Sequence, residues 1–222
     1  MGDSPGVTLA APHFMHDERL DVENLHLWRG DRHVLRGVSF SLASGECLQV
    51  TGPNGSGKTS LLRTLSALMY PEEGRVLWRG QDVRADLAAF HGALAYLGHE
   101  PPLKGELSAR ENLRYWIGVR RRIGSRALEA ALELVGAGAW CDRLVRTLSA
   151  GQRRRVALAG LALLMVPLWL LDEPTTNLDR EGQQLVADLI AEQRARGGMV
   201  VTAVHHELPA SLRDLRRLEL RA

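Results

Sequence analysis

The sequence predicts an α/β domain with a helical subdomain inserted into it. Three observations lead to this prediction. A short apolar strand at residues 47–51 runs into a glycine-rich turn, and leucines at helical spacing follow it. Two continuous apolar runs, 168–171 and 199–204, are typical of strands covered on both faces. The segment from about 101 to 163 between these ends has helical spacing, which indicates the inserted subdomain.

Length and composition suit a globular protein. The chain has 222 residues, of which 45% are hydrophobic and 24% are charged, and such a chain can bury a large core. These values exclude a disordered chain or a small disulfide scaffold. The net charge of +2 is too small to favour nucleic-acid binding, so we expect no nucleic-acid partner. Cys47 and Cys141 lie far apart without a metal-binding spacing and are predicted to be buried thiols.

The start of the domain and the absence of a membrane-spanning helix are predicted from the composition of individual segments. Residues 1–17 lack the basic and apolar segments of a signal peptide, so we expect a mobile tail before a domain over 18–222. The longest uncharged run, 156–171, is shorter than the ~20 residues that a membrane-spanning helix needs. Pro167 interrupts this run, which therefore predicts the end of a buried helix, a turn and a buried strand.

Helices are predicted from apolar spacing and from capping residues. Ser108 with Glu111, and Ser149 with Gln152, have the spacing of capping boxes that begin helices. Asp179 is placed to begin a further helix. The apolar positions expected on buried helix faces are Leu61, Leu65, Leu68, Leu113, Trp116, Ile117, Leu128, Leu132, Val135, Val156, Leu158, Leu163, Leu185, Val186, Leu189 and Ile190.

The glycine-rich turn matches the phosphate-loop pattern G-x-x-x-x-G-K-[ST] in full, with a strand before it and a helix after it. Glycines let the backbone approach phosphate oxygens, and the N–H groups of the loop and helix start attract the anion. We expect Lys58 to lie between the β- and γ-phosphates of ATP and the Thr59 hydroxyl to bind Mg²⁺. The predicted nucleotide-binding residues are Gly52, Pro53, Asn54, Gly55, Ser56, Gly57, Lys58, Thr59 and Ser60.

Two carboxylates end the apolar run at 168–171. Asp172 and Glu173 would emerge at the carboxyl edge of the sheet, where the phosphate loop also lies. Asp172 is therefore predicted to hold Mg²⁺, and Glu173 is predicted to accept a proton from the attacking water as the general base.

The segment Leu148, Ser149, Ala150, Gly151 and Gln152, here called the signature segment, follows the phosphate loop and precedes the acidic strand end. Taken together, the three motifs resemble those of ATP-binding cassette (ABC) proteins, over about residues 20–220. The resemblance implies a phosphate-loop nucleotide-binding domain with a mixed α/β core. It also implies that the signature segment contacts ATP bound by a second copy, so that ATP binding produces a homodimer.

Two further motifs appear in the order that the family has them. Asn177, Leu178 and Asp179, here called the D-loop segment, resemble the loop that crosses the dimer interface, although Asp179 would also serve as a simple helix cap. His205 resembles the catalytic switch histidine that contacts the γ-phosphate. His206 is its neighbouring competitor, and a partly buried core histidine is the alternative.

Two positions depart from the family pattern. His99 stands where the family usually has a glutamine that senses Mg²⁺ and water, and imidazole can also bind a metal or a water. The family often stacks an aromatic side chain on adenine in the region of Trp28, but Arg29 occupies the aligned position. Either side chain could stack on a base, and an ordinary apolar contact is the alternative for Trp28.

The segments around His99 and the signature segment resemble the ATP-binding subunits of bacterial cytochrome c maturation systems, often called haem exporters. The resemblance implies a translocase ATPase at the cytoplasmic face of the inner membrane, peripherally bound to integral membrane subunits. Its ATP hydrolysis would power release of a haem chaperone. A drug or lipid exporter subunit is the nearest alternative, and a soluble non-transport ABC ATPase is a more distant one.

Two clusters are candidate contact surfaces. Tyr115, Trp116 and 120–122 are candidates to face the membrane subunits, with Tyr115 and Trp116 as subdomain core the alternative. The arginines at 153–155 follow the signature segment and are interpreted as a solvated helix face.

Overall fold

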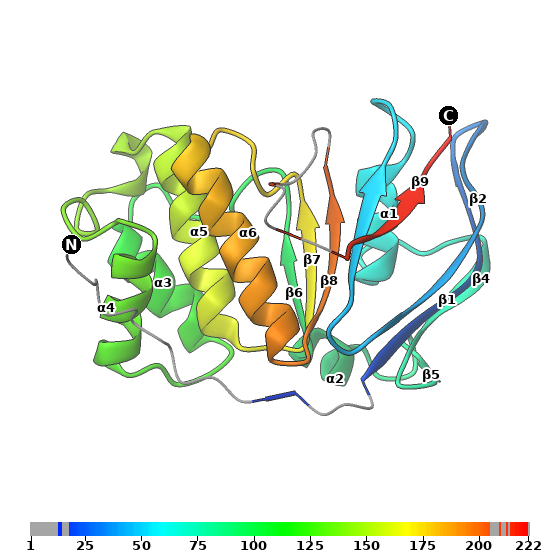
Figure 1. Cartoon of the computed structure of the whole chain (residues 1–222), viewed down its shortest axis with the longest axis horizontal. Coiled ribbons are helices and arrows are strands. Elements are labelled where there is room, and N and C mark those ends of the chain that lie inside the picture. The colour runs from blue at the N-terminus through cyan, green and yellow to red at the C-terminus, as the bar shows by residue number, and fades with distance from the viewer. Residues whose placement is uncertain (1–12, 15–17, 205–208, 210–211, 213, 222) are drawn as a thin grey trace. The chain divides into compact units, whose positions relative to one another are not determined.

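A computed structural model describes residues 13–14, 18–204, 209, 212 and 214–221. The chain forms two compact units, which are described one at a time (Figure 1). The unit here called the sheet unit comprises His13–Glu100, Val166–Thr175 and Val186–Ala222. The unit here called the helical unit includes Pro101–Met165 and Thr176–Leu185. Most of the predicted tail lies outside the described residues.

The sheet unit contains an antiparallel sheet with the strand order β2-β1-β4-β5. These strands are β1 Arg19–Arg29, β2 Arg32–Ala43, β4 Glu73–Trp78 and β5 Gln81–Asp82. A β-bulge around Asn24 (φ +48°) shifts the register of β1 against β2. The buried positions of β1 therefore change from Leu20 and Val22 to Leu25 and Leu27, because an extra residue reverses the side-chain alternation of a strand.

The second sheet of this unit is parallel and has the strand order β6-β7-β8-β3-β9 (Figure 1). Its strands are β3 Cys47–Thr51, β6 Leu94–Leu97, β7 Leu168–Asp172, β8 Met199–Ala203 and β9 Arg216–Glu219. Strands β7 and β8 are buried along their whole length, as their continuous apolar runs predicted. The phosphate-loop strand β3 and the acidic strand β7 both pair with β8, so their carboxyl ends reach the same edge.

The helices of the sheet unit are short. They are α1 Lys58–Leu65 and α2 Leu87–Gly92, while α6 Arg180–Ala195 has residues in both units. The prediction that Leu68 lies on the buried face of the first helix is wrong, since its side chain is 62% exposed. The helix ends at Leu65, and Ala67 (φ +56°) turns the chain before a further helical turn can form.

The helical unit contains α3 Ala109–Gly118, α4 Ser125–Leu134, the short 3₁₀ helix η1 Val145–Thr147 and α5 Ala150–Leu164. Both predicted capping boxes are present, one at the start of α3 and one at the start of α5. The ring of Trp116 lies against Gly160 of α5, which leaves no room for a side chain there. Trp116 is thus a packing residue, whereas Tyr115 is 54% exposed.

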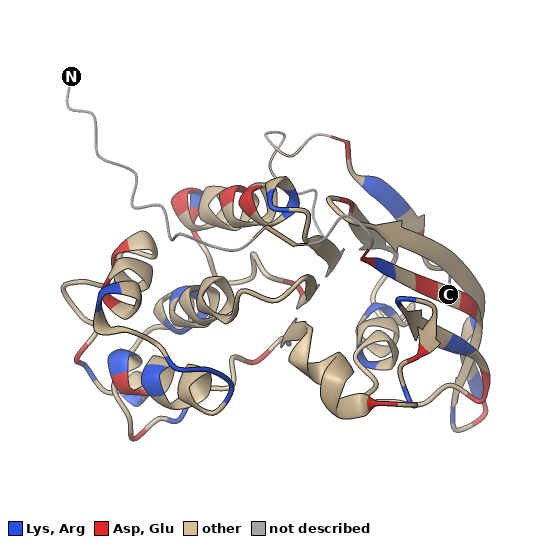
Figure 2. Cartoon of the chain, turned by 90° about the horizontal axis from the view of Figure 1, so that it is seen from below, with Lys and Arg blue, Asp and Glu red and all other residues tan. Residues whose placement is uncertain are grey.

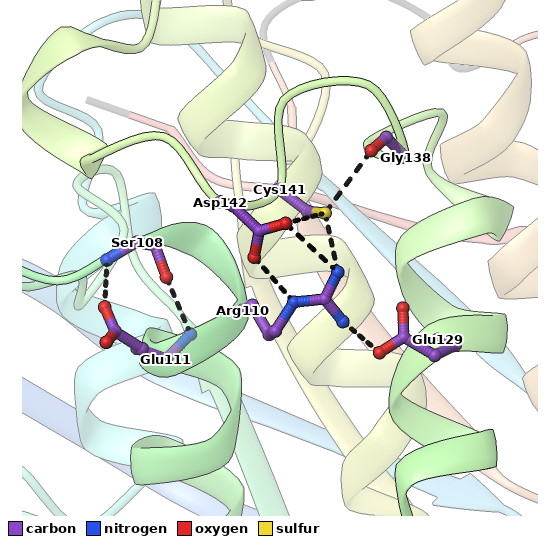
Figure 3. Close-up of polar contacts among 7 residues, drawn as sticks. All are labelled: Ser108, Arg110, Glu111, Glu129, Gly138, Cys141 and Asp142. Atoms are coloured by element: carbon purple, nitrogen blue, oxygen red, sulfur yellow. Dashed lines mark hydrogen bonds and ion pairs between the residues drawn. The ribbon is translucent and has the colours of Figure 1, made fainter.

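A network of ion pairs, with a half-buried arginine and two exposed carboxylates, joins α3, α4 and the loop before η1 (Figure 3). Arg110 Nε donates to Asp142 Oδ1 at 2.7 Å, and Arg110 Nη1 pairs with Glu129. Arg110 Nη2 lies 3.0 Å from the Sγ of Cys141. Cys47 and Cys141 are both free thiols and buried, as predicted. Burial raises the pKa of Cys47 to about 12 and also raises the pKa of Cys141, so both thiols are held in the protonated form at neutral pH.

Basic and acidic residues are spread over many helices and strands (Figure 2). This distribution accords with the small net charge of +2. Within the part of the chain that the structure describes, no helix combines the length and the apolar character needed to cross a membrane.

Candidate functional site

The phosphate loop lies between β3 and α1 in the sheet unit. Gly57, the residue that begins the helix, has φ +100°, and a Cβ there would lie 2.6 Å from Cγ1 of Val34. Only glycine therefore fits this position without displacing β2. No side chain caps the first turn of α1, so its N–H groups lack a side-chain acceptor and are suited to bind an anion.

Lys58 is buried at the start of α1 and its ammonium group is held by the loop itself. Nζ donates to the carbonyl oxygens of Gly52 at 2.7 Å and Pro53 at 3.1 Å. Burial lowers the pKa of Lys58, and the carboxylates of Glu173 and Asp172 act in the opposite direction. The ammonium is thus placed in the loop, near two negative charges.

Two other polar groups of the loop region support an anion site. The Oγ of Ser56 is buried and makes no hydrogen bond, an arrangement that a bound oxygen ligand would satisfy. Arg32, at the start of β2, donates from Nη2 to the carbonyl oxygen of Gly55 at 2.7 Å. Arg32 could not be singled out from the sequence, because nothing in its spacing separates it from the other arginines.

Asp172 ends β7 beside the phosphate loop and is only 2% exposed. The hydroxyl of Thr59 donates a hydrogen bond to its carboxylate. Burial raises the pKa of Asp172 even though this hydrogen bond lowers it. A carboxylate and a hydroxyl side by side are oxygen donors of the kind that Mg²⁺ prefers, so this pair of residues fits the predicted metal site.

Glu173 follows at the same edge, held by a backbone hydrogen bond from its N–H to the carbonyl oxygen of Ala203 at 2.9 Å. Its φ of +50° places it in the left-handed region. His99 lies close by, with Nδ1 3.9 Å from Oε2 of Glu173. The structure thus brings Glu173 and His99 together.

The two candidates for adenine stacking, Trp28 and Arg29, lie on opposite faces of the antiparallel sheet. The ring of Trp28 stacks on His33 at 3.8 Å between centroids and 6° between planes. Arg32, the residue before His33 in β2, reaches the phosphate loop with its side chain. Because side chains alternate along a strand, Trp28 and His33 occupy the other face of the sheet. Arg29 pairs with Arg32 across the turn, which places it on the phosphate-loop face.

The helical unit contains the second predicted contact region. Residues 149–152 of the signature segment and the D-loop segment line one hollow of about 460 Å³ together with Arg155. Ser149 Oγ accepts from the N–H of Gln152 at 3.1 Å, and the Gln152 side chain accepts from the N–H of Ser149 at 3.0 Å. A Cβ at Gly151 would lie 2.7 Å from the carbonyl oxygen of Asn177, so glycine permits the two segments to touch.

Asp179 caps α6, accepting a hydrogen bond from the N–H of Gly182 at 2.9 Å. Asp179 therefore has the capping role that was considered from the sequence. His205 and His206 lie outside the described residues, and the last described residue before them is Val204.

The arginines after the signature segment are not a solvated face. Arg154 is 2% exposed, and the side chain of Arg155 is 15% exposed and paired with Asp179. The interpretation from sequence was therefore wrong for both. A run of arginines at the start of a helix wraps around more than half a turn, so some of them must face inwards.

Comparison with known proteins agrees with this geometry. The sequence profile of the family described as "ABC transporter" matches residues 35–176. A "Cytochrome c biogenesis ATP-binding export protein CcmA" of Yersinia pestis is 43% identical over 199 residues, 90% of this chain and 91% of the relative. A protein of the same description from Methylococcus capsulatus is 46% identical over 195 residues, 87% of this chain and 94% of the relative.

Among solved structures, a "Putative ABC transporter (ATP-binding protein)" from Pyrococcus furiosus superposes with a TM-score of 0.79 at 25% identity, covering 91% of this chain and 97% of that one. The chain therefore belongs to the ABC transporter family, as an ATP-binding, ATP-hydrolysing subunit. Within that family its relatives include cytochrome c biogenesis ATP-binding export proteins CcmA. The predicted fold class is confirmed: the nucleotide-binding domain has a mixed α/β core with one antiparallel and one parallel sheet.

Proposed function

We propose that this chain is the ATP-hydrolysing subunit of a membrane ABC complex for haem export and cytochrome c maturation, and that its turnover powers release of a haem chaperone. The observation that carries the proposal is the identity of 43% and 46% to CcmA proteins over about nine-tenths of the chain. The presence of His99 at the glutamine position supports the same assignment.

The triphosphate of ATP is assigned to the phosphate loop. The uncapped start of α1, the buried Oγ of Ser56 and the ammonium of Lys58 together supply donors and positive charge. Thr59 and Asp172 would hold Mg²⁺ between them. Charge neutralisation on the β- and γ-phosphate oxygens is the chemistry that bound Mg²⁺ supplies.

Glu173 is assigned as the general base. One carboxylate oxygen accepts a proton from the attacking water as the water oxygen bonds to the γ-phosphorus and the bond to the β-phosphate oxygen breaks. Its backbone hydrogen bond to Ala203 fixes where the carboxylate emerges from the sheet. His99, 3.9 Å away, would orient this carboxylate or the water, or contribute to the metal site. His205 is assigned as the switch residue by resemblance alone.

The adenine base is assigned to Arg29. Its position on the phosphate-loop face favours it over Trp28, whose ring is stacked on His33. A guanidinium plane can stack on a base as an aromatic ring does.

The signature segment is assigned to the ATP of a second copy, so the active form is a homodimer that closes when ATP binds. The hollow of about 460 Å³ next to the start of α5 supports this assignment, since a helix start favours an anion. Integral membrane subunits are the expected partners, with the chain bound peripherally at the cytoplasmic face of the inner membrane. The exposed side chain of Tyr115 is a candidate contact on the helical unit.

The function is tested by replacing the chromosomal copy in the source organism with Glu173→Gln and staining membrane proteins for covalently bound haem. We expect c-type cytochromes to disappear while b-type haem proteins remain. Glu133→Gln, an exposed carboxylate on α4, is the matched control and should leave the stain unchanged. Normal c-type cytochromes in the Glu173→Gln strain would overturn the haem assignment, and a drug or lipid exporter would then be the better reading of the same ATPase.

A further inference from the structure

The side chain of Arg155 lies at the junction of three segments of the helical unit. It projects from the second turn of α5, just after the signature segment, and is 15% exposed. Its neighbours are the D-loop segment and the C-terminal end of α4. Neither the phosphate chemistry nor the general base assigns it a task.

The guanidinium is held on two sides. Nη2 donates to Oδ1 of Asp179 at 3.0 Å, and Nη1 donates to the carbonyl oxygen of Val135 at 3.3 Å. A second carboxylate oxygen, Oε1 of Glu181, lies 3.7 Å from Nη1. The planar fork of arginine can serve these directions at once, which the single ammonium of lysine cannot do.

Asp179 is the point at which this contact reaches the D-loop segment. The same Oδ1 that accepts from Arg155 also accepts from the N–H of Gly182. The hydrogen bond from Gly182, followed by the contact with Arg155, lowers the pKa of Asp179, so its carboxylate is charged at neutral pH. Meanwhile Gly151 touches Asn177 through the backbone. The D-loop segment is thus hydrogen-bonded to α5 at Asp179 and lies close against the start of α5 at Asn177.

We propose that Arg155 is a positioning residue for ATP hydrolysis, which fixes the D-loop segment to the signature helix so that both line one preformed surface. The inference rests on the proposed function, because the surface acts only if the signature segment contacts ATP bound by a second copy. Arg155 does not itself take the phosphate, since its donors are directed to Asp179 and Val135. A displacement of about 1 Å in such a surface can cost a large factor in rate.

The test is steady-state ATP hydrolysis by the full-length chain, purified with the membrane proteins that accompany it, for Arg155→Ala, Arg155→Lys and the control Arg126→Ala. We expect Arg155→Ala to lower kcat by roughly tenfold to a hundredfold. The affinity of the phosphate loop for a fluorescent ATP analogue should stay within about twofold. Arg155→Lys should recover part of kcat, and Arg126→Ala, an exposed arginine on α4, should change neither quantity.

A double-mutant cycle separates positioning from general destabilisation. Arg155→Ala and Asp179→Asn should be non-additive in kcat, with the double variant losing less than the product of the two single losses. Thermal unfolding of each variant shows whether the protein is folded at the assay temperature. If Arg155→Ala does not fold, the Arg155→Lys and Asp179→Asn pair gives the same cycle. Unchanged kcat or additive losses would overturn the proposal.

A variant in the signature segment distinguishes failure of the proposed function from failure of the positioning role. Ser149→Phe should abolish turnover if this segment contacts ATP of the second copy. Full turnover by Ser149→Phe would defeat the proposed role of the signature segment, and the positioning role with it. Loss of turnover by Ser149→Phe together with unchanged kcat in Arg155→Ala would defeat the positioning role alone.

Discussion

The phosphate loop and the signature segment both lie at the start of a helix, but the two starts are built differently. Helix α1 begins at Gly57 without a side-chain cap, and a lysine follows at once. Helix α5 begins with a reciprocal capping box between Ser149 and Gln152. The nearby cation, Arg155, is paired with Asp179.

This difference indicates that the phosphate loop binds ATP, whereas the signature segment completes the catalytic site. The first turn of α1 keeps its N–H donors available, and the lysine can exchange loop carbonyls for phosphate oxygens. The first turn of α5 has already satisfied part of its donors, and its arginine is neutralised. We infer that the phosphate loop determines ATP affinity, whereas the signature segment affects turnover.

Substitution of Glu173 by Gln has the largest expected effect. Removal of a general base should lower kcat by about 10²- to 10⁴-fold, while ATP affinity is retained because the phosphate loop is untouched. Single-turnover hydrolysis and binding of a fluorescent ATP analogue, compared with Glu133→Gln, measure both quantities. Normal turnover in the variant would remove Glu173 as the base.

Lys58→Ala should lower the affinity for ATP. Loss of a buried charge-assisted contact to phosphate is expected to weaken ATP binding by roughly a hundredfold. Lys104, which lies over the ring of Tyr115 in the helical unit, is the one other lysine of the sequence. Lys104→Ala should therefore leave the affinity unchanged. Equal affinities of the wild type and Lys58→Ala would contradict the loop assignment.

Asp172→Asn should make the nucleotide-free protein more stable while it reduces Mg²⁺-dependent turnover. Burial raises the pKa of Asp172, so the folded chain binds this proton more tightly than the unfolded chain. Stability is therefore lost as pH rises from the ordinary pKa of aspartate, about 3.9, through the raised value. The asparagine variant should therefore be more stable than the wild type at neutral pH, and this gain should vanish in acid. Thermal unfolding of the wild type and of Asp172→Asn across this pH range measures the effect. A difference in stability that does not change with pH would contradict the prediction.

The two capping boxes allow the smallest and sharpest comparison. Ser108→Ala and Ser149→Ala each remove one cap, so both should lower the free energy of unfolding by about 1 kcal/mol. We expect a fall in kcat only for Ser149→Ala, since Ser108 caps α3, away from the signature segment in the sequence. Chemical denaturation and ATP turnover of the two variants give the result. Equal turnover in both would reduce the box at Ser149 to a structural cap.

The elements predicted from sequence are those with local signals. Strand β3 and the two capping boxes appear where they were expected, and the uncharged run resolves into α5, a turn and β7. Each of these depends on residues only a few positions apart. In contrast, the antiparallel sheet was not predicted, because the bulge at Asn24 breaks the alternation of β1. Its pairing of β1 with β4 also joins residues about fifty positions apart.

In the candidate site, too, the motif residues could be predicted from the sequence, whereas the residues that support them could not. Motif residues such as Lys58 and Asp172 lie together in the sheet unit as their order along the chain suggested. The supporting contacts made by Arg32 and Arg155 could not be predicted, because arginine is abundant in this chain and only the folded geometry selects individual side chains. The exposure of Leu68 could not be predicted either. Ala67, a non-glycine residue with positive φ, ends the helix early, and its sequence gives no sign of this.

The backbone at Glu173 carries a consequence for engineering. A side chain at φ +50° is disfavoured relative to glycine by about 1 kcal/mol or more. A redesign that optimised thermal stability alone would therefore place glycine at this position and would remove the carboxylate. Design of a thermostable version of this ATPase would therefore have to keep Glu173. The left-handed backbone conformation, although unfavourable for a side chain, brings the general base to the edge of the sheet.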